Sequence, residues 1–189
     1  MDQLKSHGLI KNKLIGVNLQ RASDNATDGE ISFGVINTSK FSGSLTRVPN
    51  VGTSGLWEAP IDDVSINGRK LGFSDKTSIT DTGTTLMILP PEDATTLHDA
   101  IPGSVTDGTG NFAFPCSTVA DIAVIFGGKS FSISPKDYVG EPVGGRKNLC
   151  QSNIVGQQVG TSDQWLVGDV FLKNVHPIRN SLKVGLFGV

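Results

Sequence analysis

An aspartate followed by small and hydroxyl-bearing residues interrupts an apolar stretch near the middle of this chain. Asp81 precedes Thr82-Gly83-Thr84-Thr85, and the apolar run Leu86–Leu89 follows directly. A buried ionised carboxylate is costly unless hydrogen bonds or an opposite charge compensate it, so we expect the adjacent hydroxyls and backbone amides to bind Asp81. A carboxylate held in this way is suited to acid–base chemistry. Taken alone the pattern is weak, because Asp-x-Gly also marks ordinary turns.

A second apolar run, Trp165–Phe171, is interrupted by Gly168. Together the two segments resemble the active-site loop and the following glycine loop of one lobe of a pepsin-like aspartic peptidase (peptidase family A1) of fungal type. Trp57–Gly68 resembles the strand pair before that loop, and Phe41–Leu45 resembles the segment just upstream. Asp2–Leu19 resembles the short helix that joins the first lobe to the second. These matches follow the family's order and cover its C-terminal lobe only.

The resemblance implies a single domain over residues 1–189, an all-β lobe of packed, twisted sheets with one or two short helices. Composition agrees, since 189 residues can bury a core, and 23 glycines with 9 prolines suit short strands joined by tight turns. The net charge of −2 gives no electrostatic case for a nucleic-acid or membrane partner. No run approaches the roughly 20 apolar residues of a membrane helix.

The function implied by the resemblance is that of an aspartic-type endopeptidase lobe, which supplies one of two catalytic aspartates for peptide-bond hydrolysis at acidic pH. In such enzymes the two aspartates share one proton: one takes a proton from the attacking water, and the other donates to the scissile carbonyl oxygen. Asp81 has the catalytic role by resemblance. The other assigned residues are Gly83 and Thr84 for substrate binding, and Thr82, Thr85 and Gly168 for support of the active-site loop.

Half of that catalytic set has no counterpart in this sequence. We find one Asp-Thr-Gly, and the single tyrosine, Tyr138, matches a second-lobe loop instead of the flap that closes over substrate. Besides a peptide or protein substrate, the implied partner is a complementary N-terminal lobe or a second copy of this chain. Three functions therefore stay open: a lobe that works with a first lobe, a homodimeric peptidase of the retroviral type, and a non-catalytic binding or structural module.

Two cysteines, Cys116 and Cys150, allow either a pair of buried thiols or a bridge. The resemblance implies the bridge, which closes a loop of about 35 residues. Asn25-Ala26-Thr27 and Asn37-Thr38-Ser39 are acceptor sequences for N-glycosylation. Bridge and sequons favour a secreted or vacuolar origin for the parent protein, although Met1–Lys5 begins no apolar signal peptide.

Other residues that could carry chemistry have simpler interpretations. Asp62 and Asp63 are adjacent carboxylates, but they precede the turn at Asn67-Gly68, so we expect a solvated or backbone-bonding role. Asp169 is expected to be structural, because the family has Gly-Asp there. The three histidines are scattered and form no ligand cluster with the cysteines, so neither a metal nor a cofactor is expected.

Alternating apolar residues and turn signals predict strands over most of the chain. The two-residue signals Asn67-Gly68 and Gly127-Gly128 predict tight hairpins. The segments predicted as strands are 14–19, 30–35, 61–67 (with one slip that a bulge would explain), 70–73, 122–126 and 130–133. One clear helix is predicted after Pro90-Pro91, ending at Pro102-Gly103.

Two departures from the family concern packing around the site. Thr80 precedes Asp81 where a larger aliphatic residue is usual, which predicts looser packing beneath the loop. Val175–Asn180 stands where an aromatic strand ending in Val-Phe-Asp is usual. Because Pro177 cannot donate to a sheet ladder, we expect this strand to be at an edge or broken there.

Overall fold

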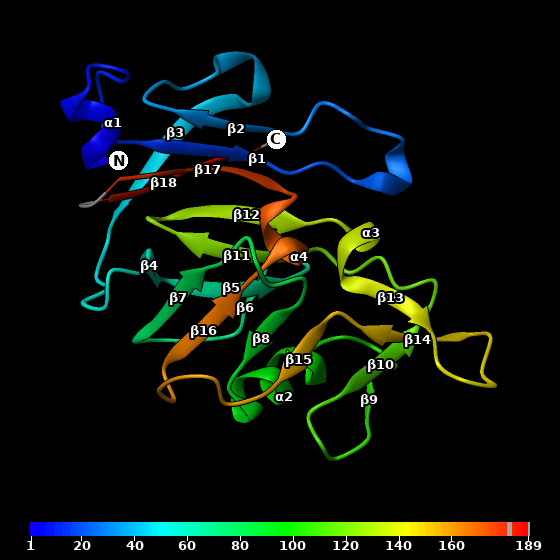
Figure 1. Ribbon diagram of the computed structural model, residues 1–189. Helices are drawn as coiled ribbons and strands as arrows, with labels where there is room; N and C mark the ends of the chain where they lie inside the picture. Colours follow the sequence, from blue (N-terminus) through cyan, green and yellow to red (C-terminus); the bar gives the residue numbers. More distant parts are fainter. Residues whose placement is uncertain (181–182, 189) are drawn as a thin grey trace.

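The computed structural model describes residues 1–180 and 183–188. Within these ranges strands dominate and form four sheets, accompanied by four short α-helices (Figure 1). The prediction of an all-β fold is confirmed.

The sheet that carries Asp81 has the strand order β15-β8-β16-β7-β4. Its strands are β4 (Glu58–Ile61), β7 (Lys76–Thr80), β8 (Met87–Leu89), β15 (Ile154–Gly156) and β16 (Gln164–Val167). β16 lies between β7 and β8, parallel to the first and antiparallel to the second. The loop of residues 81–86, which joins β7 to β8, therefore passes over the end of β16 and brings Asp81 next to the glycine loop.

A second sheet contains both predicted hairpins, in the order β12-β11-β5-β6. Its strands are β5 (Asp63–Ile66), β6 (Arg69–Lys70), β11 (Ile122–Phe126) and β12 (Lys129–Ile133). Asn67 and Gly68 have φ of 51° and 79°, the positive values that a two-residue hairpin turn requires. The strand after this turn is shorter than predicted.

The predicted strand 61–67 is wrong as a single element. β4 ends at Ile61 and β5 begins at Asp63, and the two strands belong to different sheets. The chain crosses between them at Asp62, whose amide donates to the carbonyl of Ile125 at 2.9 Å. The slip in the alternation marks this crossing and not a bulge.

The disulfide joins two strands of a third sheet, with the order β13-β14-β10-β9. Its strands are β9 (Val105–Thr106), β10 (Phe112–Pro115), β13 (Val139–Pro142) and β14 (Leu149–Ser152). Cys116 follows β10 directly and is bonded to Cys150 in β14, with 4.9 Å between their Cα atoms. The predicted bridge is confirmed.

The fourth sheet lies across the top of the molecule in Figure 1, in the order β2-β1-β17-β18-β3. Its strands are β1 (Ile15–Asn18), β2 (Glu30–Phe33), β3 (Ser42–Pro49), β17 (Val175–Arg179) and β18 (Lys183–Gly188). β17 is a central strand, so the prediction that Pro177 lies at an edge is wrong, whereas the alternative of a break at the proline holds for the ladder to β1. Pairing with β1 involves only Ile178 and Arg179, whereas pairing with β18 continues through Pro177. The proline is tolerated because the ladder to β1 has already ended.

Helices are few and short. They are α1 (Asp2–Ser6), α2 (Pro91–Asp99), α3 (Pro135–Tyr138) and α4 (Asp169–Leu172), with single 3₁₀ turns at Ala22–Asp24 and Thr38–Lys40. α2 confirms the helix predicted after Pro90, and it buries Ala94, Leu97 and His98. The one-turn helices α3 and α4 were not predicted. In the part of the chain that the structure describes, no helix is long and apolar enough to cross a membrane.

One continuous cluster of buried apolar side chains links the sheets. Trp165, Tyr138, Phe114, Phe126 and Phe171 are its largest fully buried members. Trp165 lies in β16, directly before the glycine loop, so the strand that supports Asp81 is anchored in the centre of this core.

Candidate active site

Asp81 is half-buried at the end of β7, and each of its carboxylate oxygens accepts one hydrogen bond. The amide of Gly83 donates to Oδ1 at 2.9 Å, and the hydroxyl of Thr84 donates to Oδ2 at 2.6 Å. The backbone amide of Asp81 donates to the carbonyl of Val167 in β16 at 3.0 Å. The aspartate is thus fixed by its own loop and by the neighbouring strand.

These contacts set the charge of the carboxyl group. The Thr84 hydroxyl, the Gly83 amide and, more weakly, the Arg179 guanidinium hold the pKa of Asp81 below its ordinary value of 3.8, against the opposing effect of burial. Hydrogen bonds to a carboxylate favour its ionised form. These contacts therefore favour the ionised form of Asp81.

Gly168 supports the active-site loop through backbone contacts alone. Its amide donates to the carbonyl of Leu86 at 3.1 Å, and the next amide, that of Asp169, donates to the carbonyl of Thr84 at 2.8 Å. A Cβ on Gly168 would stand 2.1 Å from the Thr84 oxygen and 2.5 Å from the Leu86 oxygen. Only glycine fits at this position.

The other residues assigned to the site lie on the same loop. Thr82, Gly83 and Thr85 are exposed, and the Thr85 carbonyl accepts from the amide of Val170 at 3.1 Å. The hydroxyl hydrogen of Thr84 is engaged with Asp81, so any contact of this hydroxyl with a substrate would use its oxygen as acceptor. The structure therefore brings Asp81, Gly83, Thr84 and Gly168 together, and leaves Thr82 at the surface.

Trp57 is hydrogen-bonded to Thr80, the residue directly before Asp81. The carbonyl of Trp57 accepts from the amide of Thr80 at 3.0 Å and from its hydroxyl at 3.3 Å. Thr80 is buried, and its extra polar atom is thus satisfied. The guanidinium carbon of Arg179 lies 5.1 Å from the centre of the Trp57 ring. Neither Arg179 nor Trp57 was predicted to take part in the site.

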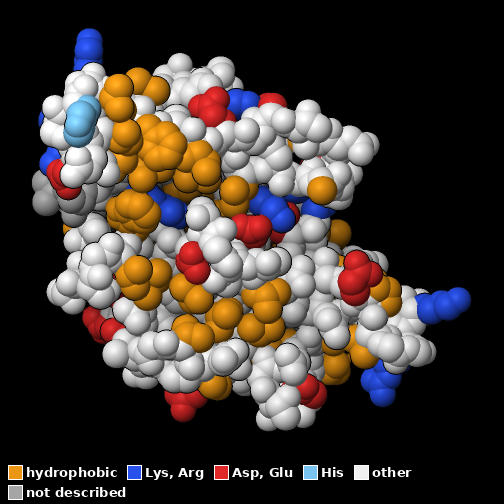
Figure 2. Space-filling view, viewed as in Figure 1, with side chains coloured by type: hydrophobic (Ala, Val, Ile, Leu, Met, Phe, Trp, Pro, Cys, Tyr) orange, Lys and Arg blue, Asp and Glu red, His pale blue; other side chains and the backbone are white. Residues whose placement is uncertain are grey.

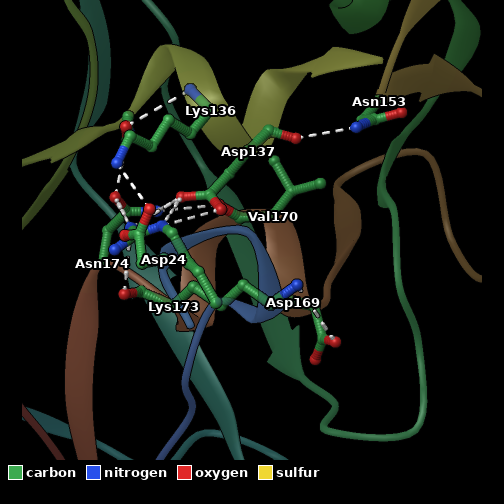
Figure 3. Close-up of polar contacts among 10 residues, drawn as sticks. Asp24, Lys136, Asp137, Asn153, Asp169, Val170, Lys173 and Asn174 are labelled. Atoms are coloured by element: carbon green, nitrogen blue, oxygen red, sulfur yellow. Dashed lines mark hydrogen bonds and ion pairs between the residues drawn. The ribbon is translucent and has the colours of Figure 1, made fainter. Parts of the chain in front are cut away.

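Asp169 is close to Asp81 along the glycine loop but belongs to another set of contacts. Its carboxylate lies 3.8 Å from the ammonium of Lys173, the residue that directly follows α4. Burial, followed by the neighbouring negative charges, raises the pKa of Asp169. Its side chain points away from the polar cluster drawn in Figure 3.

That polar cluster anchors α4, the helix after the glycine loop. Arg21 donates from Nε and from a terminal nitrogen to the carboxylate of Asp137, with a closest distance of 2.7 Å. Asn174 donates to Asp137 at 2.8 Å and to the carbonyl of Val170 at 2.9 Å (Figure 3). The contacts join the loop after β1, helix α3 and helix α4, and so fix the segment that follows Gly168.

A cavity of about 490 Å³ opens beside the active-site loop. Its wall includes Leu86 at the end of the loop, Val155 in β15, and the charged residues Asp107 and Arg146. Its size is that of a site for a small ligand or a few side chains. No sequence motif predicted it, because its walls come from segments that are distant in the chain.

The other carboxylates singled out in the sequence are bound by backbone amides. Asp63 is buried and accepts from Val64, Gly72 and Phe73, while Asp62 accepts from Gly128. The expected backbone-bonding role is confirmed. In residues 1–180 and 183–188 no group of histidine, cysteine and acidic side chains has the arrangement of a metal site.

Comparison with known proteins defines the family to which this chain belongs. The family model described as "Eukaryotic aspartyl protease" matches residues 1–185, and the chain belongs to this family. The chain is 45% identical over 179 residues to the "Aspartic-type endopeptidase ctsD" of Aspergillus fumigatus, covering 94% of this chain and 37% of that protein.

More distant relatives match over a similar range. The chain is 37% identical to "Rhizopuspepsin" of Rhizopus chinensis, covering 95% of this chain and 44% of that protein. It is 33% identical to "Cathepsin D" of Dictyostelium discoideum, covering 92% and 46%. The chain thus spans between about a third and a half of the length of the curated relatives it matches.

Proposed function

We propose that residues 1–189 form one pepsin-like lobe, the C-terminal one, and that Asp81 is one of the two catalytic aspartates of an aspartic-type endopeptidase. The observation that carries the proposal is the carboxylate of Asp81, half-exposed at a strand end and held by the Gly83 amide and the Thr84 hydroxyl. A rigidly held carboxylate open on one side is what a reaction shared between two carboxylates and one water requires.

The proposed mechanism divides the work between Asp81 and a second aspartate on a partner lobe. One carboxylate takes a proton from a water held between the pair, and the water oxygen bonds to the scissile carbonyl carbon. The protonated carboxyl donates to the carbonyl oxygen, which gives a tetrahedral diol. Proton transfer to the amine then lets the carbon–nitrogen bond break. Gly83, exposed beside Asp81, leaves room for a peptide backbone to approach, and the cavity beginning at Leu86 would take substrate side chains.

A partner is needed because no other carboxylate in the described parts of the chain is bonded with Asp81 to form a pair. The charge of Asp81 contributes to the raised pKa of Asp169, but the Asp169 carboxylate lies 3.8 Å from the Lys173 ammonium. The second acid must therefore come from another lobe. Its negative charge would raise one of the two pKa values of the pair. The pair would keep its shared proton only below that raised value, so the reaction would require acid.

An exposed apolar strip supports the proposal of a partner lobe. Ile31, Phe33 and Val35 alternate along β2 and beyond it, and are 62%, 49% and 63% exposed. Figure 2 shows hydrophobic side chains gathered over the part of the upper sheet where β2 lies. A protein usually covers an apolar strip of this kind with another surface. A first lobe or a second copy of this chain would cover it.

We also propose a secreted or vacuolar location for the parent protein. The bond between Cys116 and Cys150 needs an oxidising compartment to form and persist. Asn25 of the first sequon is exposed, whereas the side chain of Asn37 is engaged with Ser39 and Glu30.

Sedimentation velocity combined with a peptide-cleavage assay in acid separates the three open functions. A monomer without activity, which gains activity when a first lobe is supplied, supports the proposal. Activity that appears only in a dimer of the chain, and that is blocked by statine-type peptides, favours the homodimeric peptidase. An inactive chain that still binds peptides, and stays inactive with a first lobe, favours the binding module and contradicts the proposal.

A further inference from the structure

Arg179 is a buried cation on the central strand β17. Its side chain is 3% exposed, and the guanidinium lies over the Trp57 ring at 5.1 Å from the ring centre. In the described residues, its Nε and one terminal nitrogen have no hydrogen-bond partner. A buried cation without acceptors is costly, so a nearby negative charge must stabilise it.

The negative charge that acts on Arg179 is that of Asp81. Burial lowers the pKa of Arg179 to about 10, and the charge of Asp81 opposes that effect. The two residues are connected through Trp57, because the Trp57 carbonyl accepts hydrogen bonds from Thr80, the residue before Asp81. Arg179 is thus linked to the strand that carries Asp81 through its contact with the Trp57 ring.

The charges around Asp81 come from two elements. Arg179 in β17 favours the carboxylate form of Asp81. Asp81 in turn contributes to the raised pKa of Asp169 in α4, an effect opposed by Lys173, whose ammonium lies 3.8 Å from the Asp169 carboxylate. Arg179 is therefore the cation that acts on Asp81 across space, in addition to the Thr84 and Gly83 hydrogen bonds.

We propose that Arg179 is a positioning residue of the site, a buried cation that keeps Asp81 ionised so that the proton shared by the assembled pair rests on the partner's aspartate. The inference deepens the proposed function and rests on it. It assigns the roles within the pair. Asp81 takes the proton of the attacking water, and the partner's carboxyl donates its proton to the scissile carbonyl oxygen.

This arrangement is a feature of this sequence. Arg179 stands in the segment Val175–Asn180, where the resemblance leads one to expect an aromatic strand ending in Val-Phe-Asp. A neutral side chain at that position would leave Asp81 without the cation that favours its ionised form. With Arg179 present the pair stays singly protonated to lower pH, because the member that resists protonation takes up the second proton only in stronger acid.

The test is an NMR titration of the Asp81 carboxyl carbon in the isolated chain, assigned by comparison with Asp81→Asn. The variants are Arg179→Met and Arg179→Gln, which remove the charge, and Arg179→Lys, which keeps it. Arg47→Met is the matched control: it removes an exposed arginine of the same sheet, which pairs with Gly185 on the neighbouring strand. We expect the pKa of Asp81 to rise in both neutral variants and to stay lowered in Arg179→Lys and Arg47→Met.

A pKa of Asp81 in the neutral variants equal to that of the parent chain would overturn the inference, as would an equal rise in Arg179→Lys. A reciprocal measurement needs no change at Arg179. In Asp81→Asn the Nε–H of Arg179 should exchange with water faster than in the parent, and an unchanged rate would contradict the coupling. Neither readout depends on catalysis. If Arg179 and Asp81 are coupled but the two-lobe enzyme is inactive, only the proposed function is contradicted. If the two-lobe enzyme is active but Arg179 and Asp81 are not coupled, only this inference is contradicted.

Discussion

Gly168 lies so close to the carbonyl oxygen of Thr84 that a Cβ at this position would stand 2.1 Å from it. The contact is between backbone atoms of two loops, so no side-chain rotation can relieve it. It also orders the loop that holds Asp81, because the Thr84 carbonyl binds the next amide, that of Asp169. Placement of the candidate catalytic residue therefore depends on a residue with no side chain.

Gly168→Ala should destabilise the chain by about 1 to 3 kcal/mol, the usual cost of forcing extra atoms into a packed site. Gly144→Ala is the matched control, since nothing lies within 4 Å of a Cβ built at Gly144. Urea unfolding of both variants measures the difference. Equal stability of the two variants would mean that the close approach of the loops is not as described.

Thr84→Val should raise the pKa of Asp81, because it removes the hydroxyl that donates to Oδ2 at 2.6 Å and leaves a side chain of similar shape. A lowered folded-state pKa stabilises the fold above the ordinary value of 3.8, and this contribution disappears as the pH falls through the folded value. Thr84→Val should therefore lose stability near neutral pH and show a weaker dependence in acid. Thr84→Ser, which keeps the hydroxyl, should behave like the parent in the same titration.

His98 should make the fold less stable in acid. It is buried, stacks on Phe112 with ring centres 3.9 Å apart, and contacts the Ala94 carbonyl and the Ser152 hydroxyl. Burial lowers the pKa of His98 from 6.5 to about 4. The unfolded chain binds the proton first, so stability contributed by neutral His98 is complete above 6.5 and is lost as the pH falls toward about 4.

His98→Gln tests this by chemical unfolding at a series of pH values. Across that pH window the free energy of unfolding of the parent should fall by on the order of 3 kcal/mol more than that of the variant. This corresponds to about 1.4 kcal/mol for each unit of difference between the unfolded and folded pKa values. Some dependence should persist in the variant, because burial also lowers the pKa of His176. The same slope in both proteins would contradict a buried neutral His98.

Removal of the disulfide by Cys116→Ala with Cys150→Ala should cost about 3 to 4 kcal/mol, the chain-entropy value for residues 34 apart in sequence. Thermal unfolding with and without a reducing agent gives the comparison. The double variant should be insensitive to the reductant. Thiol titration of unfolded, unreduced protein should find no free thiol, and two free thiols would contradict the bridge.

The features of the fold that were predicted correctly depend on local chemistry. Asn67-Gly68 marks a hairpin because its backbone needs positive φ, and Pro91 with Glu92 marks a helix start, so both were visible in a few residues. The errors concern partners far apart in sequence. The change of sheet at Asp62 and the central place of Pro177 both depend on which strands lie alongside, and alternation within one strand does not contain that information.

For the site, the loop motif indicated Asp81 and its neighbours, since Thr84 and Gly83 are adjacent in sequence. The motif did not indicate the direction of the Thr84 hydroxyl, which depends on the loop's bend. The contact between Arg179 and Trp57 was not predicted, because Arg179 lies in β17 and Trp57 directly precedes β4, a strand of another sheet. An arginine in a short strand with Val175, Pro177 and Ile178 was the available signal.

The most direct test of the central claim measures peptide cleavage by a two-lobe protein. This chain would be fused behind the first lobe of the Aspergillus fumigatus relative, with and without Asp81→Asn, and assayed in acid at roughly pH 3 to 5. The chain alone is the third sample. We predict cleavage by the fused protein, none by its Asp81→Asn variant and none by the chain alone as a monomer. Cleavage by the Asp81→Asn fusion, or by the monomeric chain, would contradict the account.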